Sequence, residues 1–289
     1  MGISRAVAHR CARGYFWKAG VRDQYELLAP EDHKGNKIVC AAAVKKDILH
    51  EGGSYIEKFH EKFILESGGD DAQTEDIKVA INSFSRPVLK FKIKPSSKAD
   101  PITVYVAHLK SKRPTDIYRE GWYRDDNEFY KKHSDGLGAA LSTIRRSAEA
   151  AALRMFITEE IKYTDTPVVV MGDLNDGMLS NTLNIISEQP NYLLSGHSKG
   201  GSDVGLYNAN TLQEYRSLRS VYYTHVHQNV KESLDHILVS QEFYDNSRKR
   251  VWAFKGLEIL NDHLNTDDHK ETGTTDHGIV KATFEYRPA

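Results

Sequence analysis

Thr166-Pro-Val-Val-Val-Met-Gly-Asp-Leu-Asn-Asp176 is a short apolar run that passes directly into polar side chains. The apolar residues after the proline predict a short buried strand, and Gly172 ends it. Asp173 and Asn175 follow two residues apart, and alternate residues of an extended chain point the same way. We therefore expect them to present a carboxylate and an amide oxygen to one hard cation or one phosphate. Alone, the pattern fits an ordinary strand-ending turn equally well.

Three other stretches also attach polar residues to strand-like runs. Residues 102–107 alternate like a strand and run into His108-Leu-Lys-Ser111. Asp235 lies inside the apolar run 234–239, where a carboxylate without a partner would be costly. His236, beside it, faces the other side of that strand and reads as structural. Asp276 and His277 precede Gly-Ile-Val280.

In chain order, His-Leu-Lys-Ser, Gly-Asp-Leu-Asn, Leu-Asp-His-Ile and Thr-Asp-His-Gly-Ile-Val resemble the signature set of the endonuclease/exonuclease/phosphatase superfamily, the deoxyribonuclease-like metal phosphoesterases. The resemblance covers roughly residues 35 to 286 and is closest to bacterial members with a His-Leu-Lys-Ser motif. It implies an α/β sandwich of two stacked mixed sheets flanked by helices. All four motifs would then meet at one edge.

The resemblance also implies a role for each motif residue. His277 is expected to be the general base, with Asp235 orienting its ring and stabilising the imidazolium. His108 would donate to a phosphate oxygen, and Asp173 and Asn175 would hold the attacking water or the metal-bound phosphate. Carboxylates and an amide without a cysteine cluster favour Mg²⁺ or Mn²⁺ over zinc. The expected metal ligands are Asp173, Asn175 and Asp276.

The chain departs from the family pattern at its start. Family members begin with a strand that bears an asparagine, and a Gln-Glu-Val stretch with a metal-binding glutamate follows; neither motif is found here. We therefore expect a missing N-terminal strand and helix, an unpaired sheet edge and weak metal affinity. Glu26 and Glu31 are unconvincing substitutes. A binding protein that keeps the fold but catalyses poorly is thus an alternative to an enzyme.

Composition limits the remaining possibilities. A chain of 289 residues with 39% hydrophobic content can bury a core, and we expect one domain over residues 1–289. Lys plus Arg number 39 against 40 Asp plus Glu, so a polyanion must be gripped locally. The two cysteines, Cys11 and Cys40, are too few for a disulfide framework, which suits the cytoplasm. No apolar run reaches membrane-span length, and residues 1–22 predict an amphipathic helix, with a targeting peptide as the rival.

Helical spacing of apolar residues predicts a long helix after Ser134 or Asp135, either of which could cap it. Ser180 is expected to cap a second helix. Residues 52–75 look irregular, 77–84 and 87–93 look like two strands, and 195–210 read as a loop. The long helix should bury Leu137, Leu141, Ile144, Ala148, Ala151, Met155 and Phe156 and expose Arg145, Arg146 and Glu149.

Residues 110–133 form an insertion in which aromatic residues alternate with charged ones. Trp122 and Tyr123 could stack bases, although the near-balance of charge fits a plain packed loop equally well. Arg86 resembles a substrate-side arginine of the family, or it is a surface cation. The tract 262–269 could be mistaken for a metal cluster and reads as a solvated loop. The predicted activity is phosphodiester hydrolysis by a nuclease, with a phosphatase for a small molecule or a lipid headgroup as the rival; oligomeric state is left open.

Overall fold

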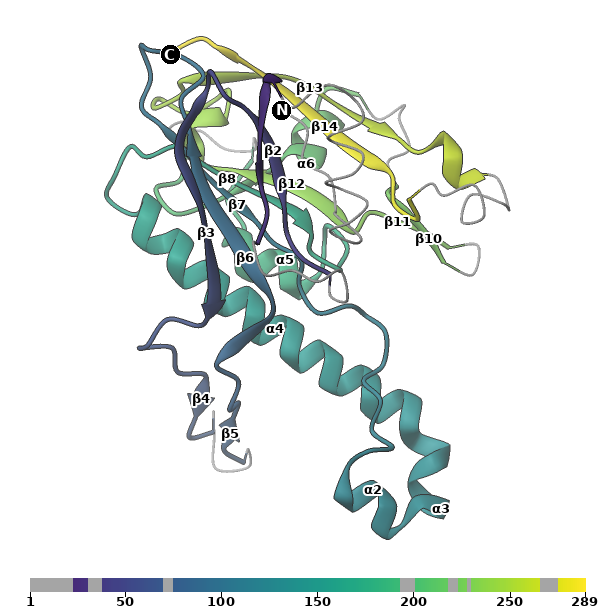
Figure 1. The fold of residues 1–289 in the computed structure, drawn as a ribbon. Helices are drawn as coiled ribbons and strands as arrows, with labels where there is room; N and C mark the ends of the chain where they lie inside the picture. The colour runs from purple at the N-terminus through teal and green to yellow at the C-terminus, as the bar shows by residue number, and fades with distance from the viewer. Residues whose placement is uncertain are drawn as a thin grey trace.

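The computed structural model describes residues 23–30, 38–69, 75–192, 201–217, 223–227, 230–265 and 275–289. Its centre is a six-stranded sheet (Figure 1). Strands β7 and β8 are parallel and the other neighbouring pairs are antiparallel, so the sheet is mixed. The strands, in spatial order, are β3 (Leu49–Lys58), β6 (Ser83–Ile93), β7 (Ile102–Val106), β8 (Val168–Asp173), β12 (Asp235–Val239) and β9 (Tyr207–Asn208).

One face of this sheet is covered by the long helix α4 (Ser134–Ile161) and by α5 (Asn181–Ser187). Helix α4 lies between β7 and β8 in the chain. Parallel strands cannot be joined by a tight hairpin and need a crossover connection, which this helix provides. Small and branched side chains fill the contact, including Ala148, Leu153 and Val170, each fully buried. Ser180 accepts a hydrogen bond from the Leu183 amide at 3.3 Å, which confirms it as the cap of α5.

The opposite face is covered by a second β layer. Within the described residues this layer consists of two antiparallel pairs that are not bonded to each other. Helix α6 (Ala209–Glu214) adds Leu212 to the same core. The mixed α/β fold with helix-flanked sheets is therefore confirmed. The pairs are β1 (Tyr25–Leu28) with β2 (Ala42–Lys45), and β13 (Trp252–Leu260) with β14 (Ile279–Tyr286).

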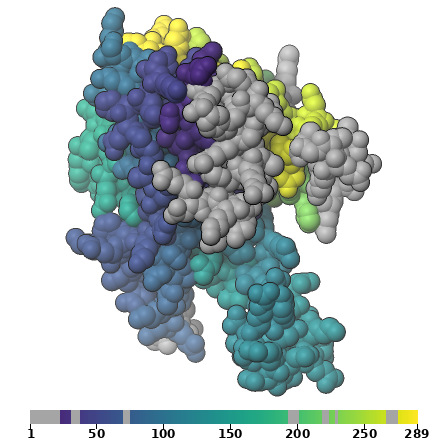
Figure 2. Space-filling view, in the orientation of Figure 1, coloured from purple at the N-terminus to yellow at the C-terminus, as the bar shows by residue number. Residues whose placement is uncertain are grey.

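Two segments project from the body (Figure 2). The first is the pair β4 (Glu66–Ser67) and β5 (Ile77–Lys78). The second, which we call the arm, is residues 110–133 with helices α2 (Gly121–Asp125) and α3 (Asn127–Tyr130) and the short helix η2 (Lys131–His133). Smaller elements are β10 (His225–His227), β11 (Val230–Glu232), η4 (Gln241–Phe243) and η5 (Asp262–Asn265).

The predicted orientation of α4 was wrong in its first half. Leu137, Leu141 and Ile144 are 39%, 43% and 48% exposed, because this half extends beyond the sheet toward the arm. Arg146 and Glu149, expected at the surface, are buried. The predicted cap was also wrong: α4 starts at Ser134 without a side-chain cap, and the Ser134 hydroxyl donates to the Lys131 carbonyl.

Other predicted boundaries need correction. Residues 49–58, seven of which lie inside the stretch read as irregular, form β3, because backbone pairing with β6 overrides the mixed composition. Strand β6 runs unbroken through Ser85 and Arg86. The predicted loop 195–210 ends in β9 and the start of α6. The predicted helix 1–22, Glu31 and the second half of the tract 262–269 lie outside the described residues.

Candidate active site

Parallel pairing of β7 and β8 brings the first two motifs together. Val106 lies opposite Met171, and the pairing continues past the strand ends, where the Leu109 amide donates to the Asp173 carbonyl at 3.1 Å. Gly172 permits this close approach: its φ is 134°, and a Cβ there would lie 2.1 Å from the Ala107 carbonyl oxygen. His108 and Asp173 are therefore neighbours at one edge of the sheet.

The third and fourth motifs meet at the same edge. Asp235, the first residue of β12, lies directly opposite Asp173, the last residue of β8. His277 precedes β14 and is held by an isolated bridge to His225 and by the Gly278 amide, which donates to the Thr224 carbonyl at 2.7 Å. His277 Nδ1 lies 2.7 Å from Asp235 Oδ2, which is the distance of a strong charge-assisted hydrogen bond.

Asp173 lies between two imidazoles. Its Oδ2 is 3.3 Å from Nε2 of His108 and 4.0 Å from Nε2 of His277. Asp173, His108 and His277 are 4%, 5% and 7% exposed. The carboxylate and imidazole groups of the cluster are therefore shielded from bulk water. Electrostatic interactions are stronger in such a low-dielectric environment than in water.

Asn175 lies at the cluster, but its backbone conformation differs from the predicted one. It is not extended but left-handed, with φ of 56°, so the strand alternation that we invoked does not apply to it. Its amide N–H donates to Asp173 Oδ1 at 3.1 Å, and its side-chain Nδ2 donates to the Leu109 carbonyl at 3.0 Å. With Nδ2 engaged there, Oδ1 is the side-chain atom that can act as a ligand.

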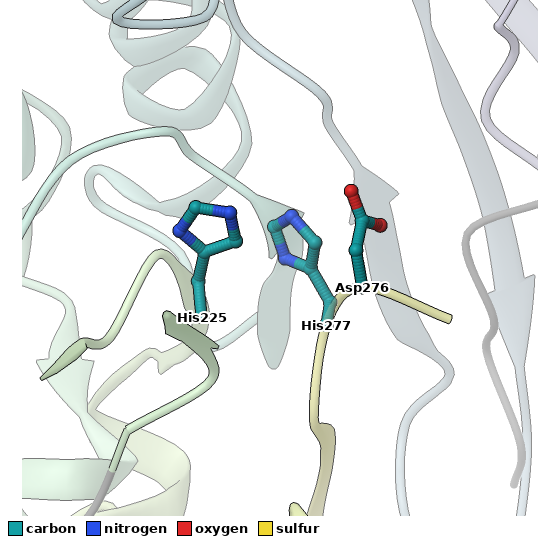
Figure 3. Close-up of side chains that lie close together, drawn as sticks. All are labelled: His225, Asp276 and His277. Carbon is teal, nitrogen blue, oxygen red and sulfur yellow. The ribbon is translucent and has the colours of Figure 1, made fainter. Parts of the chain in front are cut away.

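His225 was not singled out by the sequence analysis. Its ring centre lies 4.9 Å from that of His277, and Asp276 stands on the other side of His277 (Figure 3). Ligand atoms of His225, Asp276 and His277 all lie within 4.8 Å of one another, and those of Asp173, Asp235 and His277 form a second such group. Burial, together with the nearby His277, lowers the pKa of His225. The Thr-His-Val-His alternation before Asp235 was the available signal for His225.

A network of hydrogen bonds and ion pairs behind the cluster holds the loop after β8. Asp176 accepts a hydrogen bond from Thr182 at 2.7 Å and pairs with Arg146 and Lys112, each at 3.3 Å. Burial raises the pKa of Asp176, but the Thr182 hydrogen bond and the two cations outweigh it, so the net pKa is lowered. Asp176 is therefore a carboxylate that fixes the loop carrying Asn175.

Glu149 of α4 joins the helix to both neighbouring strands. One carboxylate oxygen accepts the Ser85 amide and the other accepts the Lys110 amide, each at 2.8 Å. The side chain is 0% exposed. Sequence reasoning missed Glu149 because the amides it pairs come from distant segments.

The remaining predicted site residues lie in different places. Arg86 is close to the cluster, where its Nη1 donates to the Leu109 carbonyl at 2.9 Å. Trp122 and Tyr123 lie on the arm, where the ring of Trp122 packs edge-on against Tyr130 with centres 4.8 Å apart. Glu26 is exposed in β1 and belongs to neither of the possible metal-ligand groups.

His236 is structural, as expected. It is 1% exposed, and its Nε2 lies 2.9 Å from the Asp176 carbonyl oxygen. Burial lowers its pKa. Cys40 is a buried free thiol whose pKa burial raises to about 12. The Cys40 thiol therefore stays protonated at neutral pH.

The fold and the site together define an α/β sandwich with a carboxylate and histidine cluster at the ends of its central strands. The chain belongs to the endonuclease/exonuclease/phosphatase family, whose model matches residues 94–277. Members of this family are hydrolases of phosphate esters.

Solved structures of the same family are similar in fold. An endonuclease/exonuclease/phosphatase from Bacteroides vulgatus is 14% identical, with a TM-score of 0.50, over 96% of this chain and 81% of that one. The human Nocturnin catalytic domain is 15% identical, with a TM-score of 0.49, over 94% and 76% of the two chains. No curated protein matches the chain.

Proposed function

We propose that this chain hydrolyses phosphodiester bonds with the help of a divalent cation, and that nucleic acid is its substrate. The observation that carries the proposal is the Asp235–His277 pair, in which His277 is buried and Asp235 is half-buried. The pair stands beside Asp173 and His108 at the ends of β8 and β7. Family membership limits the chemistry to phosphate esters. The nuclease activity, the cation and the cytoplasmic location are our predictions.

His277 is suited to act as the general base. Its Nδ1 faces the Asp235 carboxylate at 2.7 Å, which favours the tautomer with the proton on Nδ1 and leaves the lone pair on Nε2. Nε2 would take a proton from water as the water oxygen bonds to phosphorus and the ester oxygen leaves. Asp235 then stabilises the imidazolium that forms.

The oxygen donors present fit a hard cation. Asp173, Asn175 and Asp276 would hold it, since carboxylate and amide oxygens are the ligands that Mg²⁺ and Mn²⁺ prefer. Such an ion would neutralise charge on the phosphate oxygens. His108, fixed 3.3 Å from Asp173, would donate to a phosphate oxygen from the other side.

In this proposal an extended substrate runs past the cluster and beside a neighbouring hollow. A hollow of about 460 Å³ adjoins Asp176 and is open to solvent. Small-molecule sites usually enclose most of the ligand, and this hollow does not. It is lined by residues 176–180 and 231–233. Arg86, Trp122 and Tyr123 are our candidates for contacts further along such a substrate.

The test compares plasmid DNA, single strands, a p-nitrophenyl phosphodiester and p-nitrophenyl phosphate, with Mg²⁺ or Mn²⁺ and after chelation. We expect diester hydrolysis that needs the added ion. Preference for the monoester would favour the phosphatase, and absence of turnover on all four would favour a binding protein. Activity that survives complete chelation would contradict the metal-dependent mechanism.

A further inference from the structure

His225, Asp276 and His277 form a compact cluster on the outer side of the site. Their ligand atoms lie within 4.8 Å of one another. Backbone contacts hold the two segments together, namely the His225–His277 bridge and the 2.7 Å bond from the Gly278 amide to the Thr224 carbonyl. Figure 3 shows the three side chains side by side, all rising from the backbone in the same direction.

We propose that this cluster binds a borderline transition-metal ion such as Zn²⁺ or Co²⁺, and that the bound ion inhibits hydrolysis. Two imidazoles and one carboxylate form a set of three ligands that suits zinc-like ions, which leave further positions to water. Mg²⁺ instead prefers oxygen ligands. The cluster shares Asp276 with the oxygen donors assigned to the catalytic cation, and its two imidazoles give it a different ion preference.

Asp235 prepares His277 for this binding. A metal-ligating histidine usually donates its other ring N–H to a carboxylate, which fixes the tautomer and raises the basicity of the ligating nitrogen. His277 has this arrangement, because Nδ1 faces Asp235 at 2.7 Å, which leaves Nε2 as the ring nitrogen that would bind the ion. Asp276 is exposed and His225 is partly exposed, so an ion can enter from solvent.

Inhibition follows because His277 would use the same lone pair as a general base and as a metal ligand. The Nε2 atom that would accept a proton from water cannot do so while it binds a metal ion. This part of the inference rests on the proposed function. The binding part does not, since it depends only on the three side chains.

The binding test uses Co²⁺, whose visible absorption reports its ligands directly, added to the full chain after chelation and dialysis. His225→Gln should weaken Co²⁺ binding at least tenfold, since even outer partners of a metal site typically contribute about 10- to 100-fold in affinity. His227→Gln is the matched control on the same strand, with its ring centre 6.2 Å from that of His225, and should bind like the wild type. Equal Co²⁺ affinity in the wild type and His225→Gln would overturn the site, as would equal weakening by His227→Gln.

The inhibition test measures phosphodiester hydrolysis in Mg²⁺ at rising Zn²⁺, with each variant normalised to its own rate without Zn²⁺. We expect His225→Gln to need at least tenfold more Zn²⁺ for half inhibition, and His227→Gln to behave like the wild type. An unchanged Zn²⁺ response in His225→Gln would overturn the inhibitory role. If no variant hydrolyses the ester, the proposed function fails, while the Co²⁺ titration still decides whether the site exists.

Discussion

Three carboxylates in and beside the site are buried or half-buried, and each is tied to a specific partner. Asp235 faces His277, Asp173 faces His108, and Asp176 accepts from Thr182. Each is a carboxylate that burial alone would penalise. Glu242 is a contrasting case, because its surroundings stabilise the protonated form.

Glu242 should make stability depend on pH. It is 2% exposed, and burial raises its pKa from 4.5 to about 7, although the Ser240 hydroxyl donates to it at 2.5 Å. Between these values the folded state holds a proton that the unfolded state has lost, so stability falls as pH rises from about 4.5 to about 7. The full effect is on the order of 3 kcal/mol.

Glu242→Gln should remove this dependence and raise the melting temperature at pH 8 by several degrees. Thermal unfolding at pH 5, 6, 7 and 8 measures both effects. The control Glu258→Gln, at an exposed side chain, should follow the wild-type curve. A parallel curve for Glu242→Gln would show that Glu242 is charged in the folded state throughout this range.

Sequence alone located the residues that touch one another in the cluster, because each motif is attached to a strand-like run. It did not find His225 or Glu149. Both act through contacts between segments far apart in the chain. The Thr-His-Val-His alternation was the only local signal for His225, and nothing in the local spacing marks Glu149. Asn175 was assigned correctly to this edge for the wrong geometric reason, since the left-handed turn at that residue is invisible to a strand-alternation argument.

Among the elements, α4 couples the core to the site. Glu149 accepts the amides of Ser85 in β6 and of Lys110 beyond the end of β7, while the rest of its turn packs against the sheet. Glu149→Gln would place an NH₂ donor opposite one of these N–H groups. We expect a loss of about 1–3 kcal/mol in the free energy of unfolding by urea.

The matched control is Glu159→Gln on the same helix, whose side chain is 59% exposed. It should change the free energy of unfolding by less than about 0.5 kcal/mol. If both variants lost the same free energy of unfolding, the amide contacts of Glu149 would contribute no more to stability than the side chain of an exposed helical glutamate does.

The arm presents exposed aromatics on a segment that the sheet does not support. Trp122 is 41% exposed, and Tyr118 and Phe129 are about half exposed. If the arm binds nucleic acid, Trp122→Ala and Tyr123→Ala should each weaken single-strand binding by about 1–3 kcal/mol. Hydrolysis of the p-nitrophenyl diester should change little. Equal effects on both substrates would instead mark these residues as packing within the arm.

The arrangement of helices and strands also explains why the burial of α4 was predicted incorrectly from the sequence. The apolar stripe of α4 predicted a buried face along its whole length, yet only the half from Ala148 onward lies over the sheet. Periodicity reports which side of a helix is apolar, and the position of its neighbours decides how much of that side is covered. The second β layer was expected from the family resemblance, but its division into two separate pairs within the described residues was not, because pairing partners are not local.

For the whole molecule, the fold matters because it joins four distant segments at one edge. Parallel β7 and β8 end together, antiparallel β12 starts opposite β8, and the bridge to β10 seats His277 beside them. None of the described helices combines the length and apolar content that crossing a membrane would require. The central claim is that Asp235 and His277 act as one catalytic unit within this frame.

A double-mutant cycle on phosphodiester hydrolysis tests that claim most directly, with circular dichroism to verify folding. His277→Ala should lower turnover by roughly 10²- to 10⁴-fold, the usual contribution of general-base catalysis. Asp235→Asn acts through the same ring, so the account predicts that the double variant is little slower than His277→Ala alone. Losses that multiply in the double variant would contradict it, since the two residues would then contribute independently.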